Sequence, residues 1–402
     1  MEHFERQFPT VGGLERVVID KEGSESLQPM LIRVKERHDA IEAAFNQYEH
    51  NPLPLEFLTH SFGGDVIQVW QTITDTGRIF RVCIGTSIER EAALRAIAEN
   101  ARKGCVVDTL TFYVMRRLGI EDAVSAVCGA IGITESSVDV FRLRSEEIRS
   151  HFGNTFMTIF WRNGQYFRHE FTDEELRSAL KEAENDLSWI KEHCEVLPAE
   201  GTRDLPSDLR EFAKKVGRDF FDPILAADGA GRLLLCEDFT YRIIGGQSGL
   251  RTSWLQPVLM AARHENLITM AKFCEVVLNM IECRTQFISI DAQVLLMVVR
   301  DKTDEDGRKF AKVAETLGGP DADIGSIIRV AANFFGEIWR EWDPALRHKA
   351  QTGKILECLM RGRGEIYPHI SAALLKSVVS PGSGFRDYLL GWLRGHFFLP
   401  VK

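Results

Sequence analysis

The chain has 402 residues, of which 45% are hydrophobic, and a formal net charge of −9 from 49 basic and 58 acidic residues. This length allows two domains or one domain with large additions, and the charge excludes nucleic-acid binding through bulk electrostatics, so any polyanion site must be local. The N-terminus has charges where a signal peptide needs an apolar run, and no stretch approaches the roughly 18 apolar residues of a membrane helix. We therefore expect a cytoplasmic protein with no membrane partner.

The first part of the chain, residues 1–102, predicts a mainly helical N-terminal region. Apolar side chains recur at helical spacing over residues 31–48, 55–73 and 89–102. One run of strand-forming residues, 79–85, interrupts these helices and predicts a strand.

A unit of strand, acid and helix follows. The short apolar strand Cys105–Val107 ends at Asp108, and the next helix has Phe112, Met115 and Leu118 on one side. Taken alone, an Asp at this position is equally typical of a helix N-cap.

A weaker copy of this unit comes next. A strand is predicted near residues 130–134, followed by a helix that carries Glu135 and Asp139. Asp139 belongs either to an exposed face of this helix or to a site formed with other acids.

Residues 156–171 predict a β-hairpin, which we interpret as an insertion. Two aromatic-rich runs flank Asn163-Gly164, a pair typical of the type I′ turn. Thr172 followed by Glu175 has the pattern of a capping box and predicts the start of a helix. The composition is typical of a loop over 201–206, and a helix then leads to the next strand.

The segment GRLLLCEDFTYR begins as a buried strand and ends with Glu237 and Asp238 side by side. In a parallel sheet the carboxyl ends of neighbouring strands meet at one edge, so we expect Asp238 and Asp108 to converge. Asp222 stands with a proline in the first turn of a helix, from which its carboxylate points outward. Convergent carboxylates favour hard cations such as Mg²⁺ or Mn²⁺.

Other polar residues allow more than one interpretation. Glu237 is a metal ligand, a solvated loop carboxylate or a partner of Arg242. Thr109 either holds Asp108 by a hydrogen bond or is an ordinary residue at a strand end. Five bases either contact RNA phosphates or form a solvated helix face: Arg347, Lys349, Lys354, Arg361 and Arg363.

Cysteine and histidine spacing favours neither zinc nor disulfides. The eight cysteines form no C-x-x-C pair and are interpreted as buried thiols, and the eleven histidines show no pair at zinc-binding spacing. Beyond residue 249 the apolar periodicity is almost wholly helical. We divide the chain into a helical region 1–102, a domain 103–301 with the hairpin insertion, and a helical region 302–402 that packs on this domain or on a second copy.

The runs CVVDTLTFYVMRRLG, ITESSVDVF and DPILAADGAGRLLLCED followed by TYR resemble the acid signature of the PIN domain, a family of metal-dependent ribonucleases. Residues from about 103 to 290 resemble the divergent bacterial PIN modules often found C-terminal to TPR repeats and GreA/GreB-C-like segments. The resemblance implies an α/β fold with a three-layer core around a parallel sheet. It places Asp108, Asp222 and Asp238 at acid positions that hold Mg²⁺ or Mn²⁺.

The chain departs from this family at the second acid and upstream. A Glu is expected soon after Val138, where the sequence has Val140 and Phe141. Either Asp139 or Glu135 substitutes for it, or the position is lost. The upstream modules of the family are not visible in the first hundred residues, which leaves any shared partner open.

The resemblance implies a bacterial endoribonuclease that hydrolyses RNA phosphodiester bonds with water activated by the metal. Two other functions stay open. The chain is alternatively a catalytically degenerate PIN fold that binds or assembles with a protein partner or a second copy of itself, or it is a structure-specific DNA nuclease.

Overall fold

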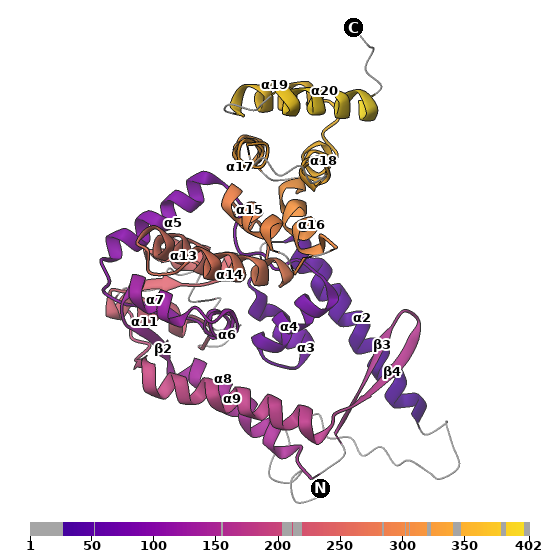
Figure 1. Cartoon of the computed structure of the whole chain (residues 1–402). Coiled ribbons are helices and arrows are strands. Elements are labelled where there is room, and N and C mark those ends of the chain that lie inside the picture. Colours follow the sequence, from indigo (N-terminus) through magenta and orange to yellow (C-terminus); the bar gives the residue numbers. More distant parts are fainter. Residues whose placement is uncertain are drawn as a thin grey trace, which may run out of the picture.

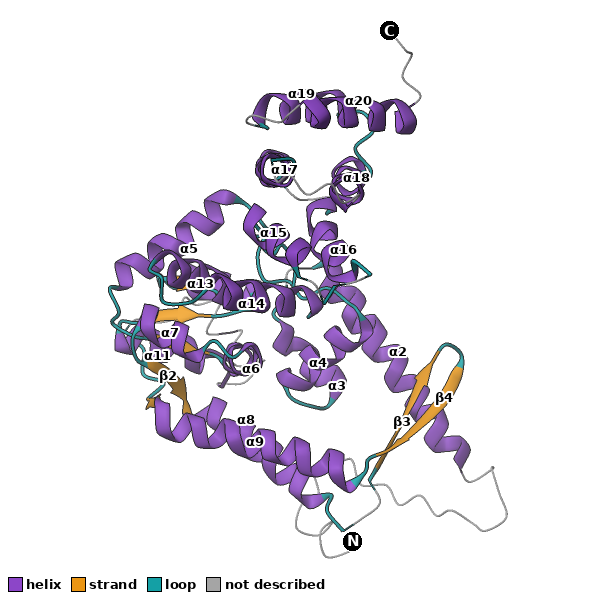
Figure 2. Cartoon of the chain, in the orientation of Figure 1, coloured by secondary structure: helices purple, strands orange, loops and turns teal. Residues whose placement is uncertain are grey.

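Helices dominate the structure, and the strands form one small sheet and a separate hairpin (Figure 1, Figure 2). Within the described ranges no helix combines the length and the apolar character that a membrane span requires. The computed structural model describes residues 27–51, 53–153, 156–202, 211, 219–283, 285–301, 303–304, 306–319, 323–340, 347–378 and 383–397.

The N-terminal helices agree with those predicted from the sequence. They bury Phe45, Ile67, Trp70 and Ile97 against one another and against the central domain. Their bounds are α2 (Gln28–His50), η2 (Leu55–Leu58), α3 (Thr59–Phe62), α4 (Val66–Thr76) and α5 (Ser87–Asn100).

The strand predicted for residues 79–85 is wrong. The segment is extended, but apart from one isolated bridge its backbone groups bond to side chains and to other elements. The Arg81 N–H donates to the Tyr48 hydroxyl (3.1 Å), and the Val82 carbonyl accepts from Arg242 (2.6 Å). Because these partners satisfy the backbone, the segment needs no neighbouring strand.

A five-stranded parallel sheet lies at the centre of the fold, in the order β5-β2-β1-β6-β7. β1 pairs with β6 in the register Val107↔Leu235, so both strands end at the same edge. The sequence predicted the three inner strands and missed the two edge strands, of which β7 has only two residues and β5 is partly exposed. The strands are β1 (Cys105–Val107), β2 (Ile131–Thr134), β5 (Cys194–Leu197), β6 (Leu233–Leu235) and β7 (Thr252–Ser253).

Helices cover both faces of this sheet, which confirms the predicted α/β fold with a three-layer, PIN-like core. Val106 and Leu234 pack with α11 and α12 on one face. The flanking residues of the same two strands point to the opposite face and join the larger core with α5, α7 and α13. The covering helices are α7 (Glu121–Cys128), α11 (Asp222–Ala230), α12 (Phe239–Gln247) and α13 (Leu255–His264).

The predicted hairpin and the capping box that follows it are both confirmed. β3 (Met157–Arg162) and β4 (Gln165–Glu170) pair around Asn163 and Gly164, whose φ angles of 51° and 79° suit a type I′ turn. The hairpin lies beside α2 (Figure 2), where the Tyr166 hydroxyl donates to the Leu31 carbonyl (2.9 Å). The neighbouring helices are α6 (Thr109–Leu118), α8 (Glu135–Ser150) and α9 (Asp173–His193), the last with the Thr172–Glu175 capping box.

The loop predicted at 201–206 and the helix expected before Asp222 lie mostly outside the described residues, which resume with η3 (Asp219–Phe221). All eight cysteines are free thiols, and six of them are buried.

The C-terminal helices extend the same core. α16 packs on α14 and α15, α17 packs on α15, and one buried cluster runs from the sheet to Leu393. The boundary at 301/302 therefore stays a prediction. The helices are α14 (Met270–Glu282), α15 (Ala292–Arg300), α16 (Arg308–Glu315), η4 (Thr316–Gly318), α17 (Ile324–Ile338), α18 (Arg347–Met360), α19 (Tyr367–Ser377) and α20 (Ser383–Phe397).

Truncation after Asp301 should give an aggregating or loosely packed fragment. It removes Phe310, Val313, Phe334 and Phe335, which are buried, and it leaves the apolar faces of α14 and α15 in water. The measurements are the soluble yield and the near-UV circular dichroism of the 1–301 fragment, beside the full chain. A soluble fragment with a native near-UV spectrum would show that the two parts fold independently.

Candidate active site

The carboxyl ends of β1 and β6 bring two of the predicted acids together. Asp108 follows β1 directly, and Asp238 follows β6 after two residues. Both side chains line one cleft of about 180 Å³ beyond this edge of the sheet, together with Thr109. The predicted convergence of these two carboxylates is what the structure shows, because parallel strands that pair in register end side by side.

Three other parts of the chain form the remaining walls of the cleft. α8 contributes Ser136, Ser137 and Val140, and the η3–α11 segment contributes an aromatic and a proline side chain. The third wall comes from the N-terminal helices, where Pro54 and Glu56 lie at η2. No pattern in the sequence predicts that η2 reaches this edge of the sheet.

Asp108 both caps a helix and lines the cleft. It is the N-cap of α6: one carboxylate oxygen accepts from the Thr111 backbone N–H (2.8 Å) and the other from the Thr111 hydroxyl (2.9 Å). Burial raises the pKa of Asp108, and hydrogen bonds from Cys236 and Thr111 oppose this shift. Asp108 is thus both the N-cap of α6 and one of the residues that line the cleft.

Thr111, and not the predicted Thr109, orients Asp108. Its buried hydroxyl also accepts from the Glu237 backbone N–H (2.7 Å), which links the ends of β1 and β6. Thr109 lines the cleft instead. The third helical position after an N-cap Asp is where the capping bond forms, so this spacing was a usable sequence signal.

Asp238 is more enclosed than Asp108. It caps α12, with one oxygen accepting from the Tyr241 N–H (2.9 Å) and the other from the Leu55 N–H of η2 (2.5 Å), and only 7% of the residue is exposed. Burial raises the pKa of Asp238 to about 6. The backbone hydrogen bonds oppose the shift, and the Asp108 charge adds to it.

Glu237 points to the opposite face of the sheet. The interpretation of a solvated loop carboxylate is wrong, because only 2% of the residue is exposed. Its Oε1 accepts from the Leu255 N–H (2.7 Å) at the start of α13, a helix whose N-cap residue offers no side-chain bond. Successive side chains after a strand alternate between faces, so the two adjacent acids serve two different helices.

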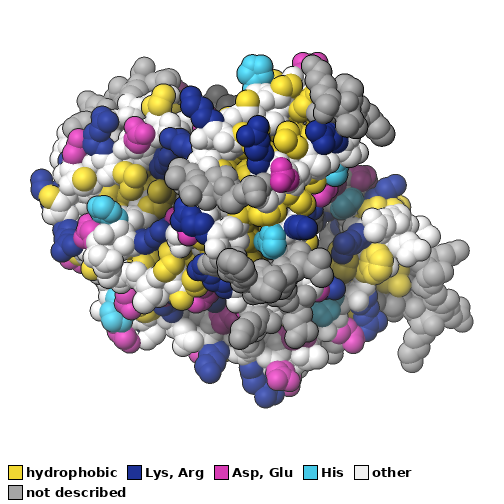
Figure 3. Space-filling view, turned by 45° about the horizontal axis from the view of Figure 1, so that its top comes forward, with side chains coloured by type: hydrophobic (Ala, Val, Ile, Leu, Met, Phe, Trp, Pro, Cys, Tyr) yellow, Lys and Arg dark blue, Asp and Glu magenta, His cyan; other side chains and the backbone are white. Residues whose placement is uncertain are grey.

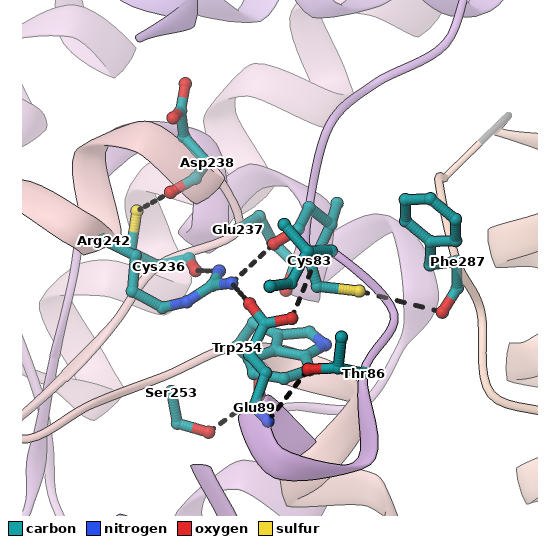
Figure 4. A network of polar contacts seen from close by, with 12 residues as sticks. Cys83, Thr86, Glu89, Cys236, Glu237, Asp238, Arg242, Ser253, Trp254 and Phe287 are labelled. Atoms are coloured by element: carbon teal, nitrogen blue, oxygen red, sulfur yellow. Dashed lines mark hydrogen bonds and ion pairs between the residues drawn. The ribbon is translucent and has the colours of Figure 1, made fainter. Parts of the chain in front are cut away.

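A buried arginine lies beside Glu237 (Figure 4). Arg242 donates to the carbonyls of Cys236 (3.0 Å) and Val82 (2.6 Å) and to Glu89 (3.1 Å), and its guanidinium lies 4.5 Å from the ring centroid of Trp254. Its charge lowers the pKa of Glu237, although burial has the larger effect and raises that pKa to about 7. The network joins the N-terminal region to the sheet.

The two remaining candidates on α8 lie outside the cleft. Asp139 is paired with Arg142 on the exposed side of the helix, and Glu135 is exposed in its first turn. The residue of α8 that lines the cleft is Val140, close to where the sequence comparison expected an acid. Neither Asp139 nor Glu135 is brought to the cleft.

Asp222 begins α11, as predicted, next to Pro223, which lines the cleft. Burial raises the pKa of the Tyr241 hydroxyl, and the charges of Glu56, Asp108 and Asp222 raise it further. Asp222 itself is not among the residues that line the cleft, whereas Glu56 and Asp108 are. Within the described part of the chain, no three Asp, Glu, His or Cys side chains are close enough to form a metal site by themselves.

The five bases between residues 347 and 363 do not form a common binding surface. Arg363 is buried and donates to the carbonyls of Leu359 (3.0 Å) and Gly319, so it is not available to a phosphate. Lys354 and Arg361 each lie within 4 Å of Glu357. Lys349 is exposed, and the side chain of Arg347 lies outside the described residues. On the face in Figure 3, Lys and Arg side chains are scattered among acidic and apolar ones.

The buried carboxyls should make stability fall as pH rises. Burial raises the pKa of Glu237 to about 7 and that of Asp238 to about 6, above the ordinary values of these side chains, so the folded state binds more protons than the unfolded state between about pH 4 and 7. Stability is then greatest below this window and is lost as pH rises through it. A shift of this size corresponds to about 3 kcal/mol for Glu237.

Glu237→Gln keeps an acceptor for Leu255 and removes the charge. Urea unfolding in EDTA should give similar free energies of unfolding for variant and wild type near pH 4, and a variant more stable by about 3 kcal/mol at pH 8. Parallel profiles for the two proteins between pH 5 and 8 would show that Glu237 has an ordinary pKa.

Comparison with known families gives one match. Residues 106–245 match a family model described as a PIN domain associated with the TPR-GreAB-C-PIN system. This confirms the resemblance inferred from the acid signature, and the matched segment contains Asp108, Asp222 and Asp238. No curated protein and no solved structure matches the chain significantly.

Proposed function

We propose that this protein is a metal-dependent endoribonuclease whose active site is the cleft beyond β1 and β6. One observation carries the proposal: in a segment that matches a PIN family model, Asp108 and Asp238 line the same cleft at the carboxyl edge of a parallel sheet. PIN domains are generally nucleases, and RNA as the substrate rests on this family analogy.

The cleft residues suit a Mg²⁺ or Mn²⁺ ion with few protein ligands. Mg²⁺ is commonly held by one or two carboxylates, several waters and the phosphates of the substrate. Asp108 and Asp238 would hold it, because both line the cleft, and Asp222 would act through its charge. Once bound, the cation supplies an activated water and offsets negative charge on the phosphoryl oxygens.

The chain's own residues then orient the reactants. Thr111 and the backbone N–H groups of Leu55 and Tyr241 fix the two carboxylates by hydrogen bonds. Ser136 and Ser137 line the cleft wall, and their hydroxyls lie within hydrogen-bond distance of the Thr134 hydroxyl (3.1 and 3.0 Å). No side-chain nucleophile is required in this arrangement.

One observation favours a second candidate, a catalytically degenerate PIN fold that binds RNA or a protein. The cleft is lined by Val140 and not by Asp139 or Glu135. Asp238 is almost completely covered by η2 and α12. A site with fewer exposed carboxylates holds a cation more weakly.

The test is an incubation of the purified chain with end-labelled single-stranded RNA, in Mg²⁺, in Mn²⁺ and in EDTA, with single-stranded and structured DNA in parallel. We expect cleavage of RNA with either cation and none in EDTA. RNA binding without cleavage would establish the degenerate module. Cleavage of structured DNA alone would establish a DNA nuclease.

The cellular location is also part of this proposal. We place the protein in the bacterial cytoplasm, where it would meet RNA. The family description associates such PIN domains with a multi-component system, so a protein partner or a second copy of the chain is proposed for the helical regions outside residues 106–245.

A further inference from the structure

A second and larger cleft lies where helices from three parts of the chain meet. Its volume is about 1000 Å³, and its walls come from α5, from the α13–α15 segment and from α17, so we call it the α5–α17 cleft. None of the described residues that line it belongs to the segment 106–245 that matches the PIN family. We propose that the α5–α17 cleft binds a small amphipathic anion, a molecule in which a phosphate or a carboxylate is attached to an apolar body. Such a site is independent of the nuclease reaction.

Much of the lining of the α5–α17 cleft is apolar. Ile97 of α5 and Phe273 of α14 line it and are buried. Partly buried apolar side chains on α13, on the loop before α15 and on α17 complete this surface: Met260, Ile290 and Val330. Ligand pockets of roughly 300–1000 Å³ are typically lined in this way, with a few polar groups that fix the ligand. The lining therefore suits the apolar body of a ligand.

Three arginines from three helices also line the α5–α17 cleft. Arg263 of α13 forms an ion pair with Asp291. Arg90 of α5 has a long contact with the Ser289 hydroxyl (3.4 Å) and no carboxylate partner among the described residues. Arg329 of α17 is exposed and likewise has no ion-pair partner in the described part of the chain. Two of the three guanidinium groups are thus available to a ligand.

The acids of the α5–α17 cleft do not offset these two charges. Asp291 pairs with Arg263, and Glu265 pairs with Arg102 (2.8 Å), which lies outside the cleft. A guanidinium matches the geometry of phosphate and carboxylate oxygens, and its hydrogen bonds to them are charge-assisted. The charge of the lining therefore favours an anion over a neutral molecule or a cation.

Part of the polar lining is held in place before any ligand binds. The buried Gln256 side chain donates to the Ser289 carbonyl (2.8 Å) and accepts from the Ser289 N–H (2.9 Å), which fixes the loop beside Arg90. The guanidinium of Arg263 lies 4.9 Å from the ring centroid of Phe273. Groups that are already ordered lose less conformational entropy when a ligand binds.

Calorimetric titration of the full-length chain in EDTA tests this site with three separate probes: adenosine 5′-monophosphate, decanoate and inorganic phosphate. We expect one of the first two to bind at least tenfold more tightly than inorganic phosphate, because phosphate alone leaves the apolar lining in water. Tighter binding of adenosine 5′-monophosphate identifies a nucleotide site, and tighter binding of decanoate identifies a site for aliphatic acids. If neither binds more tightly than inorganic phosphate, the inference is wrong.

Arg329→Met removes an exposed charge from the lining and should weaken binding of the tighter probe by about tenfold, because a charge-assisted hydrogen bond is lost. Arg95→Met is the matched control. Arg95 is an exposed arginine of α5 that does not line the cleft, so its loss should leave the affinity unchanged.

A second pair of variants blocks the α5–α17 cleft from α5. Ala98 is exposed and lines the cleft, so Ala98→Glu places a carboxylate there and should weaken binding by tenfold or more through repulsion of the anion. Ala92→Glu makes the same change at an exposed position of α5 outside the cleft and should bind like wild type. Thermal melting verifies that each variant is folded. If Ala98→Glu and Arg329→Met both bind the probe as tightly as wild type, the probe binds elsewhere and the α5–α17 cleft is not its site.

Discussion

An Asp108→Asn variant should lose RNA cleavage by a factor of about a hundred or more while it keeps the fold of the wild type. The loss follows because one of the two best-placed carboxylates no longer neutralises the cation. Metal ions supply several kcal/mol of transition-state stabilisation, and each loss of about 1.4 kcal/mol lowers the rate tenfold. The fold survives because Asn is as good an N-cap as Asp and keeps an acceptor for the Thr111 N–H.

Asp139→Asn is the matched control for this variant. Asp139 is an acid of the same domain, but it is paired with Arg142 and lies outside the cleft. Initial rates of cleavage in Mn²⁺, measured beside the melting temperatures of the three proteins, should show Asp139→Asn within about twofold of wild type. If Asp108→Asn cleaves RNA as fast as Asp139→Asn, the cleft is not the active site.

Much of the fold could be predicted from local sequence patterns. A short apolar run followed by an acid and a helical period identified β1 and β6, and the rule for parallel sheets brought Asp108 and Asp238 to one edge. The Asn163-Gly164 turn and the Thr172 capping box were equally readable. The turn and the capping box depend on interactions within a few residues. The convergence of the two acids depends on a general property of parallel sheets.

The missed features depend on partners that are distant in sequence. Asp238 accepts a hydrogen bond from the Leu55 N–H, and the two residues are separated by 183 positions. The apolar periodicity of the sequence does not predict such a bond. Residues 79–85 have strand propensity, but side chains and backbone groups of other elements bond to their backbone. Solvent exposure was one of the alternatives for Glu237 and for Arg363, because charged residues are usually exposed, whereas both are buried and bonded to backbone groups.

Arg242 carries the largest expected effect on stability. Arg242→Met should lower the free energy of unfolding by about 3–5 kcal/mol, as is typical when one member of a buried charged network is removed. The carbonyls of Cys236 and Val82 lose their donor, and Glu89 loses its ion pair. Glu237 loses the positive charge that opposes the rise of its pKa. Methionine fills the space over Trp254 but supplies no donor.

Thermal unfolding at pH 7.5 in EDTA measures this effect, and a decrease of roughly 5 °C or more is expected for a chain of this length. Arg308→Met is the matched control, because the Arg308 side chain is 85% exposed and its loss should change stability by no more than about 0.5 kcal/mol. A double variant, Arg242→Met/Glu237→Gln, separates the two contributions. Without the buried carboxylate charge it should melt above Arg242→Met, yet below wild type, because the Cys236 and Val82 carbonyls still lack a donor. If Arg242→Met melts within about 1 °C of wild type, water replaces the guanidinium and the network does not hold the N-terminal region to the sheet.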